Sequence, residues 1–164
     1  MAKLPGIVGA VVIGLGMSQF PEFTQQYQQR LGGAVDELRI ITQEFDRAAT
    51  ANGLTRDAAL AQYNTTDSDF LEQRGVDMQT VFMRFARLSE DLRVLEGANA
   101  MERLQNFAHM SDTRIAKRAW ETYKPALPLT AEGLTFAAGG GLIGFTGFSG
   151  LFGLLFYRRK RKPV

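Results

Sequence analysis

The sequence has no cysteine and a single histidine, His109, in 164 residues. The chain therefore has no disulfide, no thiolate metal ligand and no cysteine nucleophile. A protein zinc site usually needs several His or Cys ligands, so one histidine predicts no metal centre. His109 and Asp112 would share a face of an unbroken helix, but we interpret His109 as an ordinary polar-face residue. The lack of cysteine does not assign a compartment.

Motifs of catalytic sites are also missing. The sequence has no Gly-x-Ser-x-Gly stretch of the kind that presents a serine nucleophile. The glycines at 139–141 lack the lysine that completes a phosphate-binding loop. We therefore predict that the protein is not an enzyme and that it has no catalytic residue, no cofactor and no bound metal.

Net positive charge comes only from the ends of the chain, chiefly the C-terminus, and the formal net charge is only +2. Residues 17–129 carry slightly more Asp and Glu than Lys and Arg. A nucleic-acid-binding domain usually has a strongly basic patch. The acidic balance of the middle therefore predicts no nucleic-acid partner.

The C-terminal part holds a long uncharged run, residues 134–157. As a helix this run is about 36 Å long, enough to cross a hydrocarbon core of roughly 30 Å. We predict a glycine-rich transmembrane helix over 134–157 and a basic cytoplasmic tail over 158–164. The tail is read as a topology signal, as a site for anionic lipid headgroups, or as both. Its cationic residues are Arg158, Arg159, Lys160, Arg161 and Lys162.

Glycine recurs at every third position from 141 to 153 in this predicted span. In lipid, glycine lets a second helix approach closely, so we predict a helix-packing role. A three-residue repeat lags the helical period of 3.6, so the row spirals around the helix. The alternative is that glycine is simply common in membrane helices. The residues are Gly141, Gly144, Gly147, Gly150 and Gly153.

A second apolar run, residues 4–20, predicts another transmembrane helix, at the short end of the spanning range. Gly6, Ala10 and Gly14 are spaced by four residues and lie on one face, which favours close packing on another helix. A cleaved signal peptide is the competing interpretation, although no Ala-x-Ala-like cleavage site follows the run. The positive-inside rule predicts that both termini are cytoplasmic and that the middle lies across the membrane, in the periplasm of a Gram-negative host.

The middle, residues 21–125, is predicted to be a helical extramembrane domain. Apolar side chains recur every three or four residues from Phe20 to Ala48, and Asn52 and Gly53 form a stop. A short helix is expected over Arg56–Tyr63, with Thr55 as its cap.

A second apolar stripe extends from Met78 to Leu95, after a new cap at Ser68. Ser111 and Asp112 mark a restart, and Pro125 and Pro128 end the last helix. No alternating run predicts a strand. The fold class is therefore all-α, with two transmembrane helices flanking an antiparallel helical hairpin or small bundle.

One motif resembles a known family. The stretch from Ser18 through Pro21 to Phe23, followed by the segments 25–27, 30–34 and 36–38, is similar to a small uncharacterised family of proteobacterial membrane proteins. The order of parts is also similar across most of the chain. The resemblance implies an inner-membrane protein with a domain of unknown function, and it brings no catalytic residues.

Two functions remain open. The first is an integral membrane accessory or scaffold protein, in contact with membrane lipid and held through its glycine faces to another membrane protein or to a second copy of itself. The second is a periplasmic helical binding or sensor module anchored in the bacterial inner membrane.

Overall fold

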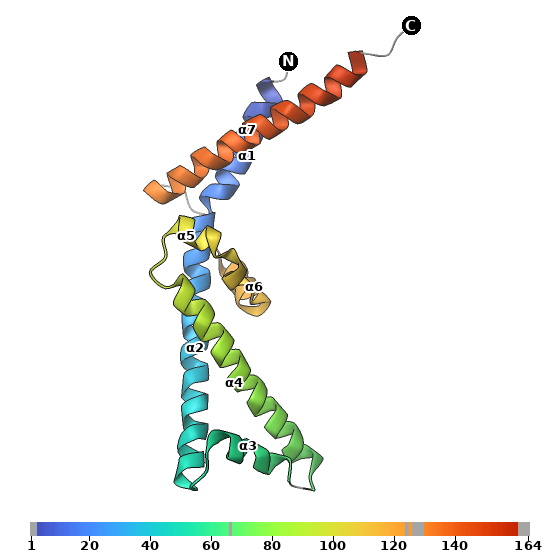
Figure 1. Ribbon diagram of the computed structural model, residues 1–164. Helices are drawn as coiled ribbons and strands as arrows, with labels where there is room; N and C mark the ends of the chain where they lie inside the picture. The colour runs from blue at the N-terminus through green and yellow to red at the C-terminus, as the bar shows by residue number, and fades with distance from the viewer. Residues whose placement is uncertain (1–2, 66, 124, 126–129, 161–164) are drawn as a thin grey trace. The chain divides into compact units, whose positions relative to one another are not determined.

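The structure is a computed structural model that describes residues 3–65, 67–123, 125 and 130–160. Every regular element in these ranges is helical, which confirms the all-α class (Figure 1). The elements are α1 Lys3–Ser18, α2 Phe20–Ala51, α3 Arg56–Tyr63, α4 Asp69–Leu95, α5 Ala100–Gln105, the 3-10 helix η1 Phe107–Met110, α6 Thr113–Thr122 and α7 Ala131–Lys160.

The chain divides into two compact units. The terminal unit comprises Met1–Gln26 and Ala119–Val164, and the central unit comprises Tyr27–Arg118. Helix α2 begins in the terminal unit and continues into the central unit. Two helical stretches have the length and composition to cross a membrane: Leu4–Ala51, which runs from α1 into α2, and Ala131–Leu155 in α7.

In the central unit, α2 ends where the sequence predicts it. Gly53 has a φ of +70°, a left-handed conformation that glycine adopts without strain. The N–H of Leu54 then donates to the carbonyl of Ala49 at 2.9 Å, which closes the last turn. Helix α3 has the predicted bounds, and the Thr55 hydroxyl accepts a hydrogen bond from the N–H of Ala58 at 3.2 Å.

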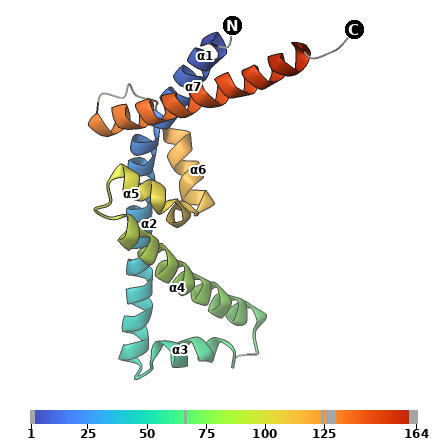
Figure 2. The same cartoon turned by 45° about the horizontal axis from the view of Figure 1, so that its top comes forward.

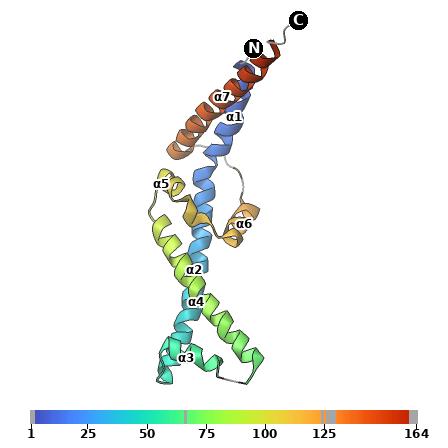
Figure 3. The same cartoon turned by 45° about the vertical axis from the view of Figure 1, so that its right-hand side comes forward.

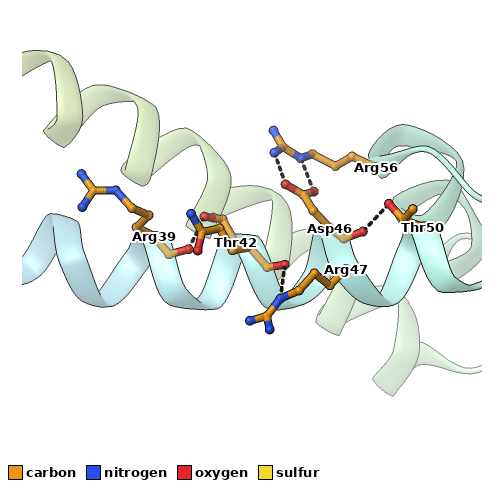
Figure 4. A network of polar contacts seen from close by, with 7 residues as sticks. Arg39, Thr42, Asp46, Arg47, Thr50 and Arg56 are labelled. Atoms are coloured by element: carbon orange, nitrogen blue, oxygen red, sulfur yellow. Dashed lines mark hydrogen bonds and ion pairs between the residues drawn. The ribbon is translucent and has the colours of Figure 1, made fainter.

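The far ends of α2 and α4 are joined by α3, as Figure 2 shows. Arg56 holds this corner together, because its guanidinium donates to both carboxylate oxygens of Asp46 (Figure 4) and lies 4.1 Å from the ring centre of Phe82. Phe45 meets Phe82 edge to face, with ring centres 5.4 Å apart. On the other side of the corner, Gly75 of α4 accepts the close approach of α3, since an added Cβ would lie 2.6 Å from the Tyr63 Cβ.

The core of the central unit lies nearer the other end of α4. Tyr27, Leu31 and Val35 occupy one face of α2 at four-residue intervals, and all three are fully buried. Leu88 and Leu95 of α4 are buried in the same unit. Tyr27, Leu31, Leu88 and Leu95 of the predicted stripes therefore form core, whereas Val35 takes the place expected for Ala34 and Ala48 is exposed.

Helix α4 ends at Leu95. The apolar pattern of the sequence continues less regularly beyond this residue and does not mark the end of the helix sharply. Gly97 has a φ of +74° and breaks the helix. Asn99 then begins α5 with a capping box, in which its side chain accepts from the N–H of Met101 and of Glu102 while Glu102 accepts from the N–H of Asn99. The predicted restart at Asp112 is confirmed by α6. Pro128 lies outside the described residues.

Candidate functional site

Helices α1 and α7 of the terminal unit pack against each other in antiparallel directions (Figure 1 and Figure 3). The neighbours of Gly6 are Phe145 and Ser149, whereas those of Gly14 are Ala137 and Gly141, so α7 numbers fall as α1 numbers rise. The N-terminal end of α1 and the C-terminal end of α7 therefore lie on the same side of this helix pair.

The contact between α1 and α7 is made by glycine. A Cβ built on Gly9 would lie 2.7 Å from the carbonyl oxygen of Gly144, and one built on Gly144 would collide with the backbone of Gly9. A Cβ on Gly14 would lie 2.9 Å from the Ala137 oxygen. Real Cβ atoms do not approach so closely, so only glycine permits this backbone-to-backbone contact.

Among the residues predicted to pack helices, the structure brings together Gly6, Ala10 and Gly14 of α1 with Gly141 and Gly144 of α7. An added Cβ on Gly141 would lie 3.6 Å from the Ala10 oxygen, which is ordinary contact. Gly9 and Gly140 belong to the same contact but are not in the predicted set. For Gly140 a signal was available in its four-residue spacing from Gly144.

The structure places the other three predicted glycines elsewhere. A Cβ on Gly147, Gly150 or Gly153 would meet nothing within 4 Å among the described residues. Each three-residue step along a helix falls about 60° short of a full turn, so Gly147 has rotated away from the face that Gly141 presents. Gly150 and Gly153 also lie beyond Ser149, which already faces Gly6 near the start of α1.

Large apolar side chains point outward from the α1–α7 pair. Val12 of α1 is 61% exposed, and Leu142 and Leu154 of α7 are 69% and 66% exposed. The pair thus has glycine at its closest contacts, beside Phe148 and Met17, and many large apolar residues outside. This arrangement is the reverse of a helix pair in water, whose apolar side chains face its core.

Aromatic side chains gather next to the start of α7 and the end of α1. Phe20 stacks on Phe136 with ring centres 5.3 Å apart. Phe23 meets both Trp120 and Tyr123 edge to face at about 6 Å. The Tyr123 hydroxyl also donates to the Gln19 side-chain oxygen at 2.7 Å. Trp and Tyr side chains, which join an apolar ring to a polar group, are typical of membrane–water interfaces.

The predicted basic tail is only partly within the described residues. Helix α7 includes the backbone of Arg158, Arg159 and Lys160, whose side chains are not described. Arg161 and Lys162 lie outside the described residues.

In the central unit, a buried carboxylate connects three segments. Asp112, whose side chain is 4% exposed, accepts from Arg84 of α4 at 2.9 Å and from Arg87 at 3.0 Å, both through Oδ2. Its Oδ1 caps α6 by accepting from the N–H of Ile115 at 3.1 Å. Its own N–H donates to the hydroxyl of Tyr27 on α2 at 3.3 Å.

These contacts determine the titration of Asp112. Burial raises the pKa of the Asp112 carboxyl, but the N–H of Ile115 and the guanidinium groups of Arg87 and Arg84 outweigh burial and hold that pKa below its ordinary value. Burial raises the pKa of the Tyr27 hydroxyl. Asp112 is thus a charged structural link at neutral pH.

His109 is paired with Asp91 and not with Asp112. Its Nδ1 lies 2.8 Å from Oδ1 of Asp91, and His109 belongs to the 3-10 helix η1, which ends before the helix that Asp112 caps. Asp91 is 7% exposed, and its Oδ2 has no hydrogen-bond partner among the described residues. Across the residues that the structure describes, no three His, Cys, Asp or Glu side chains gather closely enough to hold a metal ion.

Comparison with known proteins places the chain in a family. The profile of a family described as "Protein of unknown function (DUF2937)" matches residues 3–161, which include both apolar helices and the whole central unit. No curated protein and no solved structure matches the chain. The membership in an uncharacterised family that the motif around Pro21 predicts is confirmed. The chain belongs to the DUF2937 family of proteins of unknown function.

Proposed function

We propose that this protein is an integral accessory or scaffold protein of the bacterial inner membrane, without catalytic activity, with α1 and α7 as an antiparallel pair of transmembrane helices. The observation that carries the proposal is the distribution of side chains on this pair. Glycine lies between the helices, whereas Val12, Leu142 and Leu154 point outward. Lipid is the solvent that suits such a surface, because apolar side chains exposed to water are costly.

Two further features support the membrane assignment. The aromatic cluster of Phe20, Phe23, Trp120 and Tyr123 has the chemistry of an interfacial anchor. Because α1 and α7 are antiparallel, the start of α1 and the end of α7 lie on the same side of the membrane in this proposal. This agrees with the positive-inside rule applied to the basic tail. Both termini are then cytoplasmic and the central unit is periplasmic, as a helical hairpin of α2 and α4 closed by α3.

The scaffold role rests on the glycines that α1 does not cover. Gly147, Gly150 and Gly153 leave the backbone of α7 open among the described residues. In lipid, an open glycine face favours close contact with another helix. The partner in this proposal is another membrane protein or a second copy of this chain.

Membrane extraction at alkaline pH tests the anchor directly. An integral protein stays in the membrane pellet, and release into the supernatant would overturn the proposal. Orientation is tested with a reporter enzyme that is active only in the periplasm. The reporter should be silent when fused to the C-terminus and active when inserted after Gly53, in the turn between α2 and α3. The reverse pattern would contradict the orientation.

A binding module is the second candidate, because the central unit contains a hollow of about 570 Å³ inside the corner formed by α2, α3 and α4. Phe45, Leu54 and Leu71 contribute apolar lining, and Asn52 and Gln62 contribute polar groups. This size and mixture are typical of small-molecule sites. Co-purification in mild detergent separates the candidates, since a scaffold retains a protein partner and a binding module retains a small molecule.

A further inference from the structure

The aromatic cluster of the terminal unit contains an indole with an open face. Trp120, near the end of α6, stacks on Tyr123 with ring centres 6.1 Å apart and an angle of 18° between the rings. Phe23 meets the same indole edge to face at 6.1 Å. Trp120 is nevertheless 69% exposed. The described residues therefore cover one side of the indole and leave the other side open.

The neighbouring rings are held in fixed positions. The hydroxyl of Tyr123 donates to the side-chain oxygen of Gln19 at 2.7 Å. Tyr123 also meets Phe23 edge to face, with ring centres 6.0 Å apart. An indole that only anchors a helix at the membrane surface needs no such partners. A preorganised set of rings suits recognition, because little side-chain freedom remains to be lost when a ligand binds.

A carboxylate lies beside these rings. Glu22 directly precedes Phe23 on α2 and is exposed. Burial, and after it the negative charge of Glu22, raises the pKa of the Tyr123 hydroxyl, so the charge of Glu22 acts on the ring cluster. Glu22 takes part in none of the ion pairs among the described residues. Its negative charge is therefore available to a cationic ligand.

The combination of ring faces with a carboxylate selects for positive charge. An aromatic face carries partial negative charge and attracts an ammonium group placed within about 6 Å of the ring centre, most strongly when the ring is tryptophan. A carboxylate adds a full negative charge and a hydrogen-bond acceptor. Both groups repel an anion. This part of the terminal unit therefore has the chemistry to bind an organic cation.

We propose a headgroup site that binds the ammonium group of a zwitterionic phospholipid and is formed by Glu22, Phe23, Trp120 and Tyr123. The inference rests on the proposed membrane anchor, because these residues belong to the same compact unit as α1 and α7. Helix α1 ends at Ser18, one helical turn before Glu22. The site therefore lies next to the point where the proposed anchor leaves the hydrocarbon core, which is the level of the lipid headgroups.

A phosphatidylethanolamine headgroup has the groups that the headgroup site requires. Its primary ammonium, like that of lysine, has three N–H donors, so it can bind the carboxylate of Glu22 while it contacts the face of Trp120. The indole N–H of Trp120 makes no hydrogen bond within the described part of the chain, so it can donate to a phosphate oxygen of the same headgroup. Phosphatidylglycerol lacks the ammonium and brings net negative charge towards Glu22. The site should therefore discriminate between these two lipids.

Native mass spectrometry of the full-length protein tests this preference. The protein is released from nanodiscs that contain equal amounts of phosphatidylethanolamine and phosphatidylglycerol with the same acyl chains, and the retained lipids are counted. The natural protein should retain phosphatidylethanolamine in excess. Trp120→Leu and Glu22→Gln should each lower the ratio of the two retained lipids at least about threefold. Trp120→Phe keeps a ring face and should retain most of the preference.

Two variants make the result specific. Glu22 is exposed, so Glu22→Gln leaves the packing of the rings intact and guards against loss of fold. Glu132→Gln is the matched control, since it removes an exposed carboxylate from the first turn of α7, outside the headgroup site, and should leave the ratio unchanged. An equal fall in Glu132→Gln would reduce the effect to general electrostatics and overturn the proposal. An unchanged ratio in Trp120→Leu would make the indole an apolar anchor only and overturn it as well.

Membrane extraction at alkaline pH separates the headgroup site from the anchor on which it rests. If the natural protein stays in the membrane pellet but retains the two lipids equally, the anchor stands and the headgroup site is overturned. If the natural protein is released into the supernatant, both proposals are overturned. A natural protein that stays in the pellet and prefers phosphatidylethanolamine, together with variants that stay in the pellet and lose this preference, supports the headgroup site.

Discussion

The phenolic oxygen of Tyr27 accepts a hydrogen bond from the backbone N–H of Asp112, 3.3 Å away and 85 residues later in the chain. Tyr27 is fully buried on α2, and Asp112 caps α6. Arg84 and Arg87 bind the side chain of the same aspartate from α4. Tyr27 and Asp112 therefore connect three helices whose order in the sequence gives no direct sign of their proximity.

Tyr27→Phe should lower the free energy of unfolding by about 1–2 kcal/mol, because the buried N–H of Asp112 loses its acceptor while the ring still fills the core. Urea unfolding of the full chain in detergent, followed by circular dichroism, measures the difference. Tyr27→Leu should cost more, because it also removes part of the packed ring. Equal stability of the natural protein and Tyr27→Phe would show that the hydrogen bond contributes nothing.

Asp112→Asn should lower the free energy of unfolding by about 2 kcal/mol at pH 7 and should flatten its dependence on acid pH. The pKa of Asp112 is held below its ordinary value in the folded protein. Its contribution is therefore present above the unfolded pKa, about 3.9, and is lost as pH falls through the folded pKa. As the pH falls below about 5, the natural protein should lose more stability than the variant.

The comparison between natural and variant protein isolates Asp112 from other carboxylates. Asp46 also has a lowered pKa, chiefly because Arg56 donates hydrogen bonds to it, but both proteins retain that pair. A parallel acid decline in the two proteins would show that Asp112 does not titrate with folding. Stability profiles from pH 3 to pH 7 at constant salt make this test.

Asn99→Ala should destabilise the protein by about 1 kcal/mol, because the Asn99 side chain accepts hydrogen bonds from two N–H groups at the start of α5. Ser68→Ala is the matched control. Ser68 precedes α4 at the position predicted for a cap, but its side chain makes no capping hydrogen bond. Urea unfolding should therefore separate the two variants, and an equal loss in both would contradict the assignment.

Local features of the fold could be predicted from the sequence, because their causes lie within a few residues. Thr55 and the turn at Gly53 specify the bounds of α3 through their own conformation and hydrogen bonds. Ser68 illustrates the limit of such rules, because a residue of the right type does not guarantee the hydrogen bond. The pairing of His109 with Asp91, rather than with its sequence neighbour Asp112, depends on how η1 meets α4.

The glycine contact was partly predictable for a similar reason. The four-residue spacing on α1 predicts a packing face at Gly6, Ala10 and Gly14, and these residues lie beside α7. On α7 the three-residue repeat supplies glycines all around the helix, and no local rule tells which of them α1 covers. The hollow lined by Arg30, Arg84 and Arg114 could not be predicted from the sequence, because its residues come from α2, α4 and α6 and gather only through tertiary packing.

The last prediction concerns Gly144 and Gly147, two glycines of α7 that are three residues apart. Gly144 touches the backbone of Gly9, whereas Gly147 meets nothing within 4 Å among the described residues. Gly144→Leu should force α1 and α7 apart, because a leucine side chain cannot occupy the space of a backbone. Gly147→Leu adds the same side chain to the same helix without touching α1, so it is the matched control.

The readout is the stability of the full-length protein in mild detergent, measured by urea unfolding followed by circular dichroism. Gly144→Leu should lower the free energy of unfolding by about 1–3 kcal/mol, because its side chain displaces α1 from the backbone contact with Gly9. Gly147→Leu should leave that free energy unchanged, since an added Cβ there meets nothing within 4 Å among the described residues. An equal loss in Gly147→Leu would show that the helices meet through a different face. If Gly147→Leu keeps its stability but releases a partner in mild detergent, one face of α7 pairs with α1 and the other with the partner, as the scaffold proposal requires.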